Sequence, residues 1–518
     1  MQERFRRIAF EAEKAKEWIN ETREQIRVVS HYDADGICSA SIMAKTLRRM
    51  EKDFHLTVIK QLGKKVLDAL AGEQRKLVIF LDMGSGQLEM IKQLLPSSRV
   101  IICDHHQPKG ERNENIIHIN PNAMETQDDI SGAGVTYVVS RSIDQKNADL
   151  AHLAIIGAIG DSQIDAIGQD WGLNGMNREI LKDAEATGKI RVSKGLRLWG
   201  RCTRPLHKAL TYSLDPLIPG ISGSESASIQ FLHDLGIPAR KEAEWRTVAD
   251  LSADEQKILA GGIIRQRVMA NHENPEYIFG DVYELLENEG EFRDANEFAT
   301  MLNACGKMDK AELGIALCFS EKNAFEKVRS ILENYRKEIG RGVNWVQANA
   351  KNPEIIKDMK GIYVLAGPHI SEHIISNVIS VMNHSGIFPE KPLFGMAHSE
   401  DGVKISARAS DALVGGGLKL NEIMGDISAK LGGEGGGHMG AAAAVIPREK
   451  QEEFINMTEL ILTNIAGAKH GHEEQTEAGR RSEGQEGDQV SGSHGRGDGR
   501  KDTGKKMERQ GLVQYLGS

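Results

Sequence analysis

Short apolar segments alternate with helical stretches over the first hundred residues. Residues 26–30, 77–81 and 100–103 are apolar without polar alternation, which is typical of strands buried on both faces of a sheet. Residues 54–59 form a further predicted strand, and helical periodicity falls near 37–50 and 87–95. Strand and helix in alternation predict a doubly wound parallel α/β sheet.

The pattern also predicts elements outside this sheet. Apolar positions at helical spacing predict an amphipathic helix over 3–20, and a helix rich in Gly and Ala over 148–160. Ser252 with Glu255 forms a capping box that starts another helix. From residue 325 the helical spacing runs to 339, where Gly340 is expected to end a connector helix.

Strand-like segments return over 361–447 and predict a second, smaller α/β unit. After about residue 469 the chain is almost without apolar residues, so we expect a disordered tail. The predicted domains are the following: 1–190, an α/β domain; 191–345, an intermediate region with the connector helix; 346–468, a smaller α/β domain; and 469–518, the tail.

Composition narrows the class of protein. The chain has 518 residues, 40% of them apolar, which is enough for two or three domains. It has no run of some eighteen apolar residues, so no membrane span is expected. Five scattered cysteines indicate reduced thiols in a cytoplasmic protein. A net charge of −9 argues against a protein that coats nucleic acid by bulk charge.

The predicted strands and the Gly/Ala helix end in acidic and imidazole side chains. Because the carboxyl ends of parallel strands share one edge of a sheet, we expect these side chains in one cleft. They are His31, Asp33, Asp35, Asp82, Asp104, His105, His106 and Asp161.

A single aspartate at such a place is most simply a helix cap. So many carboxylates together favour a metal site, because they would repel one another without cations. Carboxylate combined with imidazole suits Mn²⁺ better than Mg²⁺, and there are too few thiols for structural zinc.

In order along the chain, H-x-D-x-D-G at 31–36, D-x-G at 82–84, D-H-H at 104–106 and G-D at 160–161 resemble the four motifs of the DHH phosphoesterase superfamily. The glycine run before His438 resembles the GGGH loop of the DHH-associated domain, and 403–408 its S-x-R strand. Less specific stretches, such as Asn303-Ala-Cys-Gly306, are similar to segments of the archaeal RecJ-like nucleases.

The resemblance implies two divalent cations, with Mn²⁺ favoured over Mg²⁺ or Co²⁺, and Asp82 as their bridge. It implies that Asp104 orients a neighbouring histidine and that His106 contacts the scissile phosphate. The residues that match family metal ligands are His31, Asp33, Asp35, Asp82, His105 and Asp161.

The second unit offers candidate substrate-binding residues. The glycine run Gly435, Gly436 and Gly437, next to His438, can bring backbone N–H groups to a phosphate, although such runs often mark only a flexible loop. Ser406 and Arg408 share one strand face with Lys404, and Arg408 could bind a phosphate bidentately. The alternative for this segment is an exposed polar edge strand.

A basic stretch from Lys189 to Lys208 contains no acid and includes Trp199, Arg201 and Arg204. Basic groups around a stacking aromatic are how single strands are bound without sequence preference, although most basic stretches are merely solvated surface.

Three functions fit the sequence. The first is an Mn²⁺-dependent exonuclease on single-stranded DNA, or RNA, in replication or repair. The second is a phosphoesterase for dinucleotides or nanoRNA, and the third is a replisome subunit with mainly a binding role. The archaeal resemblance implies GINS as a partner. Leu512, Tyr515 and Leu516 have the spacing of a degenerate sliding-clamp peptide, with chance apolar residues as the alternative.

Overall fold

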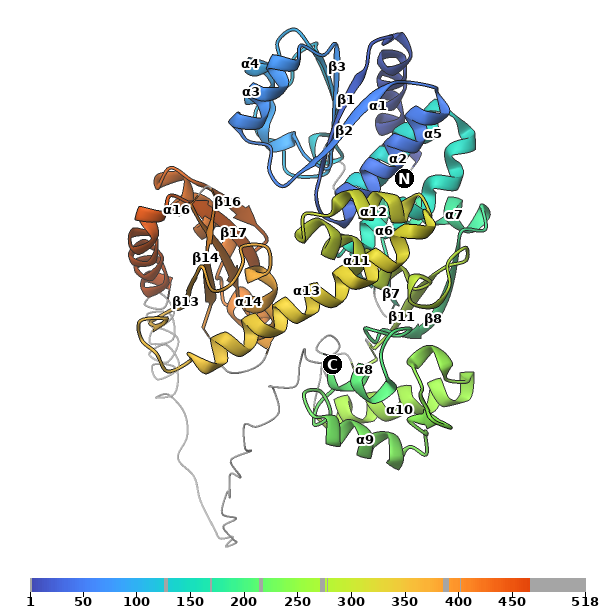
Figure 1. Ribbon diagram of the computed structural model, residues 1–518, viewed down its shortest axis with the longest axis vertical. Helices are drawn as coiled ribbons and strands as arrows, with labels where there is room; N and C mark the ends of the chain where they lie inside the picture. The colour runs from blue at the N-terminus through green and yellow to red at the C-terminus, as the bar shows by residue number, and fades with distance from the viewer. Residues whose placement is uncertain are drawn as a thin grey trace, which may run out of the picture. The chain divides into compact units, whose positions relative to one another are not determined.

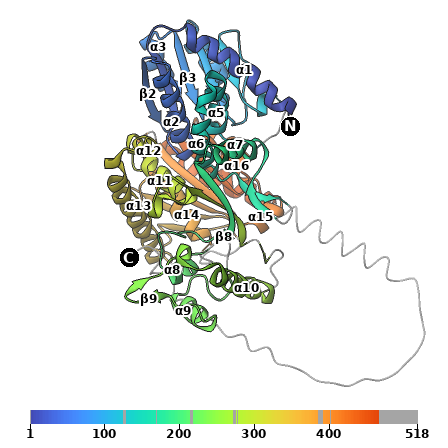
Figure 2. The same ribbon diagram turned by 90° about the vertical axis from the view of Figure 1, so that its right-hand side faces the viewer.

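The chain forms two compact units, Met1–Tyr335 and Arg336–Ser518. The computed structural model describes residues 2–124, 129–167, 170–213, 218–270, 275–276, 278–384, 391–400 and 402–465. The predicted tail and its clamp-like peptide lie outside these residues. Both units are α/β, as predicted (Figures 1 and 2), whereas the domain boundaries at 190 and 345 stay predictions. Within the described residues, no helix is long and apolar enough to cross a bilayer.

The first unit contains a five-stranded, fully parallel sheet of order β2-β1-β3-β4-β5. The four predicted strands are confirmed, and a fifth, which the sequence reasoning missed, follows them. The strands are β1 (Ile26–His31), β2 (Phe54–Ile59), β3 (Leu77–Leu81), β4 (Arg99–Cys103) and β5 (Ile116–Ile119).

Helices cover both faces of this sheet, so it is doubly wound as predicted (Figure 1). On one face α3 (Lys64–Glu73) and α4 (Leu88–Leu94) pack on Phe80 and Ile102. The other face carries α1 (Gln2–Glu21), α2 (Ala34–Arg49) and α5 (Gly132–Ile143). The predicted Gly/Ala helix is α6 (Ala151–Gly160), nearly all of it buried against α2 and α5.

The rest of the first unit extends from α7 (Gly175–Ala186). An antiparallel pair of strands, β8 (Ile190–Leu196) and β11 (Phe279–Leu285), flanks a small helical region with a core of its own. The capping box of α10 is confirmed, because Ser252 Oγ accepts from Glu255 N while Glu255 Oε2 accepts from Ser252 N. The remaining elements are β6 (Ile164–Ile167), β7 (Asp170–Leu173), α8 (Leu206–Thr211), α9 (Glu225–Asp234), β9 (Arg240–Lys241), β10 (Glu244–Trp245), α10 (Ala253–Met269), α11 (Ala295–Lys307) and α12 (Ala311–Cys318).

The connector helix α13 (Lys322–Ala348) is longer than predicted. The predicted end at Gly340 is wrong, because the helix continues for two more turns with Val343 and Val346 buried. A Cβ on Gly342 would lie 2.6 Å from Val378 Cγ2, so this glycine permits close helix packing. The burial of Val343 and Val346, which follow Gly340 and Gly342 in the helix, outweighs the roughly 1 kcal/mol that a helical glycine costs.

The second unit is a six-stranded sheet of order β12-β13-β14-β15-β17-β16. Helix α14 packs on one face, and α16 with the helical residues 451–465 packs on the other. Its elements are β12 (Ile356–Asp358), β13 (Ile362–Gly367), α14 (Ile375–His384), β14 (Leu393–Ser399), β15 (Gly402–Arg408), α15 (Asp411–Gly415), α16 (Leu420–Lys430), β16 (Glu434–Gly437) and β17 (Ala441–Ile446).

Two expectations about this sheet need correction. Strand β15 lies between β14 and β17, so it is not an exposed edge strand. The glycine run is not a loop but the edge strand β16, paired with β17. A Cβ on Gly435 would lie 2.5 Å from the Met424 carbonyl oxygen, so glycine lets this strand pass close under α16.

Candidate metal centre

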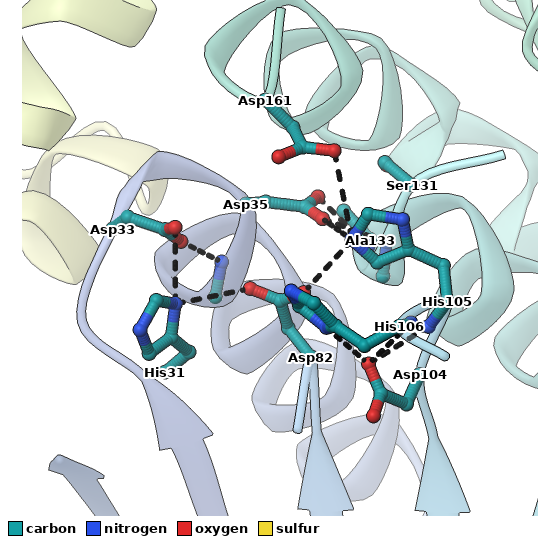
Figure 3. Close-up of polar contacts among 12 residues, drawn as sticks. His31, Asp33, Asp35, Asp82, Asp104, His105, His106, Ser131, Ala133 and Asp161 are labelled. Atoms are coloured by element: carbon teal, nitrogen blue, oxygen red, sulfur yellow. Dashed lines mark hydrogen bonds and ion pairs between the residues drawn. The ribbon is translucent and has the colours of Figure 1, made fainter. Parts of the chain in front are cut away.

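The strand order of the first sheet creates a crevice at one edge. The order 2-1-3-4-5 reverses between β1 and β3, and ligands of open α/β sheets bind at such a switch point, beyond the carboxyl ends of the strands. His31 is the last residue of β1, Asp82 directly follows β3, and Asp104 directly follows β4. The predicted side chains therefore converge there (Figure 3).

Local backbone geometry holds three of the aspartates in place. Asp33 caps α2, with its Oδ1 accepting from Gly36 N at 3.0 Å. Asp35, only 1% exposed, accepts from Gly132 N at 2.7 Å and from Ala133 N at 2.9 Å, the first amides of α5. Asp82 adopts φ +56°, a left-handed conformation that costs a non-glycine residue energy and is concentrated at functional sites.

Asp82 turns its two oxygens toward different groups (Figure 3). Its Oδ2 lies 3.4 Å from His31 Nδ1, which is itself 3.0 Å from Asp33 Oδ2. Its Oδ1 lies 3.4 Å from His105 Nε2. Asp82 thus belongs to two overlapping clusters with metal-ligand spacing.

His105 joins a further cluster with two more carboxylates. Its Nε2 lies 3.5 Å from Asp161 Oδ2 and 3.8 Å from Asp35 Oδ2. Asp161 comes from the end of α6, and Asp35 from the first turn of α2. All six predicted ligands therefore lie in one continuous cluster, with Asp82 in the middle.

The donor set fits divalent cations. His31 Nδ1, Asp82 Oδ1 and His105 Nε2 are buried atoms that make no hydrogen bond of good geometry, although each faces the cluster. Burial, Asp82 and Asp161 raise the pKa of the Asp35 carboxyl well above its usual value. Burial alone would lower the pKa of His105, but Asp82 and Asp161 raise it to about 10. Protons thus partly balance the acids of the cluster, and cations can take their place.

A buried hydrogen-bond network lies behind the D-H-H segment. Asp104 Oδ1 lies 2.7 Å from His106 Nδ1, and Asp104 Oδ2 accepts from Ser85 N at 2.9 Å. The Ser85 hydroxyl contacts His118 Nε2 at 2.8 Å and accepts from Asn120 Nδ2 at 2.7 Å. Asp104 therefore contacts His106, which is about half exposed, at 56%, and the orienting role of Asp104 stays a prediction.

Sequence reasoning missed Ser85, His118 and Asn120. The apolar run 116–119 could have indicated His118 and Asn120. It is a strand that the sequence reasoning did not recognise, and Asn120 directly follows it as acids follow the other strands. Ser85 follows the D-x-G motif directly.

In the second unit, Ser406 and Arg408 lie on the face of β15 that meets α14. Ser406 is fully buried, and Arg408 donates from Nε to Ser380 Oγ at 2.8 Å and from Nη1 to the Ala407 carbonyl at 2.8 Å. Burial lowers the pKa of Arg408. His438 is exposed in the tight turn between β16 and β17, with Gly436 and Gly437 exposed before it.

The basic stretch carries less free charge than its sequence indicates. Lys189 and Arg191 pair with Glu287 and Glu284, which β11 and the residues after it bring alongside. Arg201 Nη1 also lies 3.4 Å from Glu284 Oε1, and the Arg204 guanidinium stacks over Trp199 at 4.0 Å. The acids are about ninety residues away in sequence, so inspection of the stretch alone could not reveal them. Nucleic-acid binding by Trp199, Arg201 and Arg204 stays a prediction.

Three family models match the chain. The DHH family N-terminal domain matches residues 25–158, the DHH-CID domain 198–277 and the DHHA1 domain 362–464. The first match contains the loops after β1, β3 and β4 that carry candidate metal ligands, and the last contains β13 to β17.

Two curated relatives differ in how much they match. An uncharacterized protein of Methanocaldococcus jannaschii is 31% identical over 471 residues, which is 89% of this chain and 99% of the relative. The single-stranded-DNA-specific exonuclease RecJ of Thermus thermophilus is 28% identical over 189 residues, which is 34% of this chain but only 27% of that nuclease.

Two solved structures share the fold. RecJ of Thermus thermophilus in complex with Mn²⁺ has a TM-score of 0.54 at 16% identity, over 88% of this chain and 55% of that one. CDC45 of Entamoeba histolytica has a TM-score of 0.58 at 11% identity, over 88% and 99%.

The fold and the cluster at the strand ends define a protein of the DHH family, and this chain belongs to it. Within the family it is a RecJ-like protein, built from DHH, DHH-CID and DHHA1 domains. Membership supports a nuclease or phosphoesterase role, and the cluster is suited to divalent metal binding.

Proposed function

We propose that the chain is an Mn²⁺-dependent exonuclease that hydrolyses single-stranded nucleic acid, DNA in preference to RNA. The observation that carries this proposal is Asp82, buried at the centre of the cluster with one oxygen toward His31 and the other toward His105. Such a carboxylate can hold two cations side by side, the arrangement used for in-line displacement at phosphorus.

His31, Asp33 and Asp82 would hold one cation, and Asp35, His105 and Asp161, with Asp82, the other. Two divalent cations supply Lewis acidity and neutralise charge on the phosphate when water attacks it. Mn²⁺ is favoured because the donors mix carboxylates with imidazoles, and Mg²⁺ or Co²⁺ remain candidates.

His106 would contact the scissile phosphate. Asp104 takes up its Nδ1, so Nε2 is the nitrogen left for substrate. Burial would raise the pKa of the Asp104 carboxyl, but the two neighbouring histidines and the Ser85 amide lower it, so Asp104 stays ionised and holds the ring in one orientation.

In the second unit, Arg408 would bind a substrate phosphate. The hydrogen bonds it makes within the described residues go to neutral oxygens, and a half-buried guanidinium whose described partners include no carboxylate favours an anion. In the glycine segment that begins at Gly435, the exposed residues Gly436 to His438 would add backbone donors. Ser406, fully buried beside Arg408, accepts from Arg408 Nη1 at 3.4 Å and would support that side chain.

A polymer substrate is favoured over a dinucleotide by the DHH-CID domain and by the likeness to RecJ. The alternative is a dinucleotide or nanoRNA phosphoesterase. A binding role in the replisome is a second candidate, supported by the likeness in fold to CDC45. The complete metal cluster favours catalysis over binding alone. We propose two protein partners as well, the GINS complex and a sliding clamp that binds Leu512, Tyr515 and Leu516. The proposed site of action is the cytoplasm, in replication or repair.

The test is hydrolysis of end-labelled DNA and RNA strands of about twenty nucleotides, and of a dinucleotide, by the purified chain with Mn²⁺. We expect mononucleotide release from one end of the long strand, fastest with DNA. Asp82→Asn, which tolerates the left-handed backbone, should abolish it. The control Asp68→Asn, on the exposed face of α3, should not. Faster cleavage of the dinucleotide would favour the first alternative, and binding without hydrolysis the second.

A further inference from the structure

Helix α11 reaches the metal cluster from a distant part of the sequence. Asn303 Oδ1 accepts from Ala34 N at 2.9 Å, across 269 positions of the chain. Asn303 Nδ2 lies 3.5 Å from the Gly160 carbonyl oxygen, which is a longer and weaker contact. Ala34 directly follows Asp33, and Gly160 directly precedes Asp161. One amide group therefore contacts the backbone beside candidate ligands from two different clusters.

The amide of Asn303 has a specific task at the start of α2. The first N–H groups of a helix have no partner within the helix. Asp33, the cap residue, accepts from Gly36 N through Oδ1 and turns Oδ2 toward His31. Because Asn303 accepts from Ala34 N, Asp33 can keep Oδ2 for the cluster.

The surrounding backbone leaves Asn303 little freedom. A Cβ on Gly306, one turn further along α11, would lie 1.7 Å from the Tyr32 carbonyl oxygen. A Cβ on Gly160 would lie 2.5 Å from Ala34 Cβ. The loop before α2, the end of α6 and α11 are thus packed at the closest spacing that glycines allow, with α11 beside α6 (Figure 1).

We propose that Asn303 is a positioning residue that sets the separation of the two metal positions, by holding the Asp33 side of the cluster against the Asp161 side. It is not itself a metal ligand. This inference rests on the proposed function, because it requires that the cluster hold two cations. The inference gives the Asn303–Gly306 segment a role. That role could not be predicted from the sequence, because the segment is far along the chain from the strand motifs.

The test compares Asn303→Ala with Thr300→Ala in the full chain. Thr300 lies one turn earlier on α11, and its hydroxyl donates to the Asn296 carbonyl of the same helix. Mn²⁺ titration by calorimetry gives the number and affinity of sites, and electron paramagnetic resonance detects spin coupling between paired Mn²⁺ ions. We expect Asn303→Ala to keep one site, lose at least tenfold in affinity at the other and lose the coupled signal. Thr300→Ala should match the wild type.

Asn303→Asp keeps an acceptor for Ala34 N but loses the Nδ2 donor to the Gly160 carbonyl oxygen, so its coupled signal should lie between those of the wild type and of Asn303→Ala. This variant also provides a test if the alanine variant does not fold. The inference is overturned if Asn303→Ala binds two Mn²⁺ with an unchanged coupled spectrum, even when its melting temperature falls, since that is a structural role alone. It is also overturned if Asn303→Asp behaves as the alanine variant does. A wild-type chain that never binds a Mn²⁺ pair would instead show that the proposed function has failed, and the inference with it.

Discussion

Asp35 has two tasks that a mutation can separate. It is a candidate metal ligand, and it also accepts from the Gly132 and Ala133 amides at the start of α5. Asp161 belongs to the same cluster, yet its side chain is 29% exposed. Within the described residues it accepts a hydrogen bond from Gln163 Nε2 and none from the first amides of a helix. Asp35→Ala should therefore destabilise the metal-free protein, whereas Asp161→Ala should not, although both should lose metal.

The magnitude follows from the two amides. A buried donor left without a partner costs about 1–3 kcal/mol, so two cost about 2–6 kcal/mol. Burial and the charges of Asp82 and Asp161 raise the pKa of Asp35, which means that its carboxylate is held at some cost without metal. Its removal relieves that cost, so we expect the lower end, a loss of about 2 kcal/mol in the free energy of unfolding.

The assay is urea unfolding of both variants after chelation, near neutral pH, followed by circular dichroism. Equal stability of Asp35→Ala and the wild type, within about 0.5 kcal/mol, would refute the reasoning, because surface substitutions change stability by no more than that. An equal loss in Asp161→Ala would also refute it, since the loss would then come from the cluster as a whole.

Three further predictions concern other parts of the chain. Because the pKa of His105 is raised to about 10 in the metal-free cluster and that of Asp35 is also raised, Mn²⁺ must displace protons. Its affinity should rise as the pH rises from about 6 to 9, and calorimetry in buffers of different ionisation enthalpy should show proton release; binding without proton release would contradict this. Gly342→Ala should lower the melting temperature, because its Cβ would lie 2.6 Å from Val378, whereas Gly425→Ala in α16, whose Cβ would come no closer than 3.6 Å to a neighbouring atom, should raise stability by about 0.5–1 kcal/mol. Arg201→Glu should lower thermal stability without nucleic acid, because it sets a second carboxylate beside Glu284; unchanged stability together with weaker strand binding would support the binding role instead.

Patterns within a few residues predicted much of the fold and the cluster. The apolar runs at 77–81 and 100–103 became β3 and β4, because a strand covered on both faces has no polar side to display. The residues after them met at one edge because parallel strands all end there. The fifth strand, 116–119, was within reach of the same reasoning.

The sequence by itself determined which side chains gather at the sheet edge, since each follows its own strand or helix by local chain geometry. Only the tertiary structure decided their separate tasks, because those depend on partners distant in sequence. Asp35 holds α5, Asn303 holds the amide after Asp33, and Glu284 pairs with Arg191 and Arg201 of the basic stretch, each across eighty or more positions. For the same reason, the sequence did not show whether a glycine ends an element or lies within it. Gly342 lies inside a helix and Gly435 inside a strand because a neighbouring element passes too close for a Cβ.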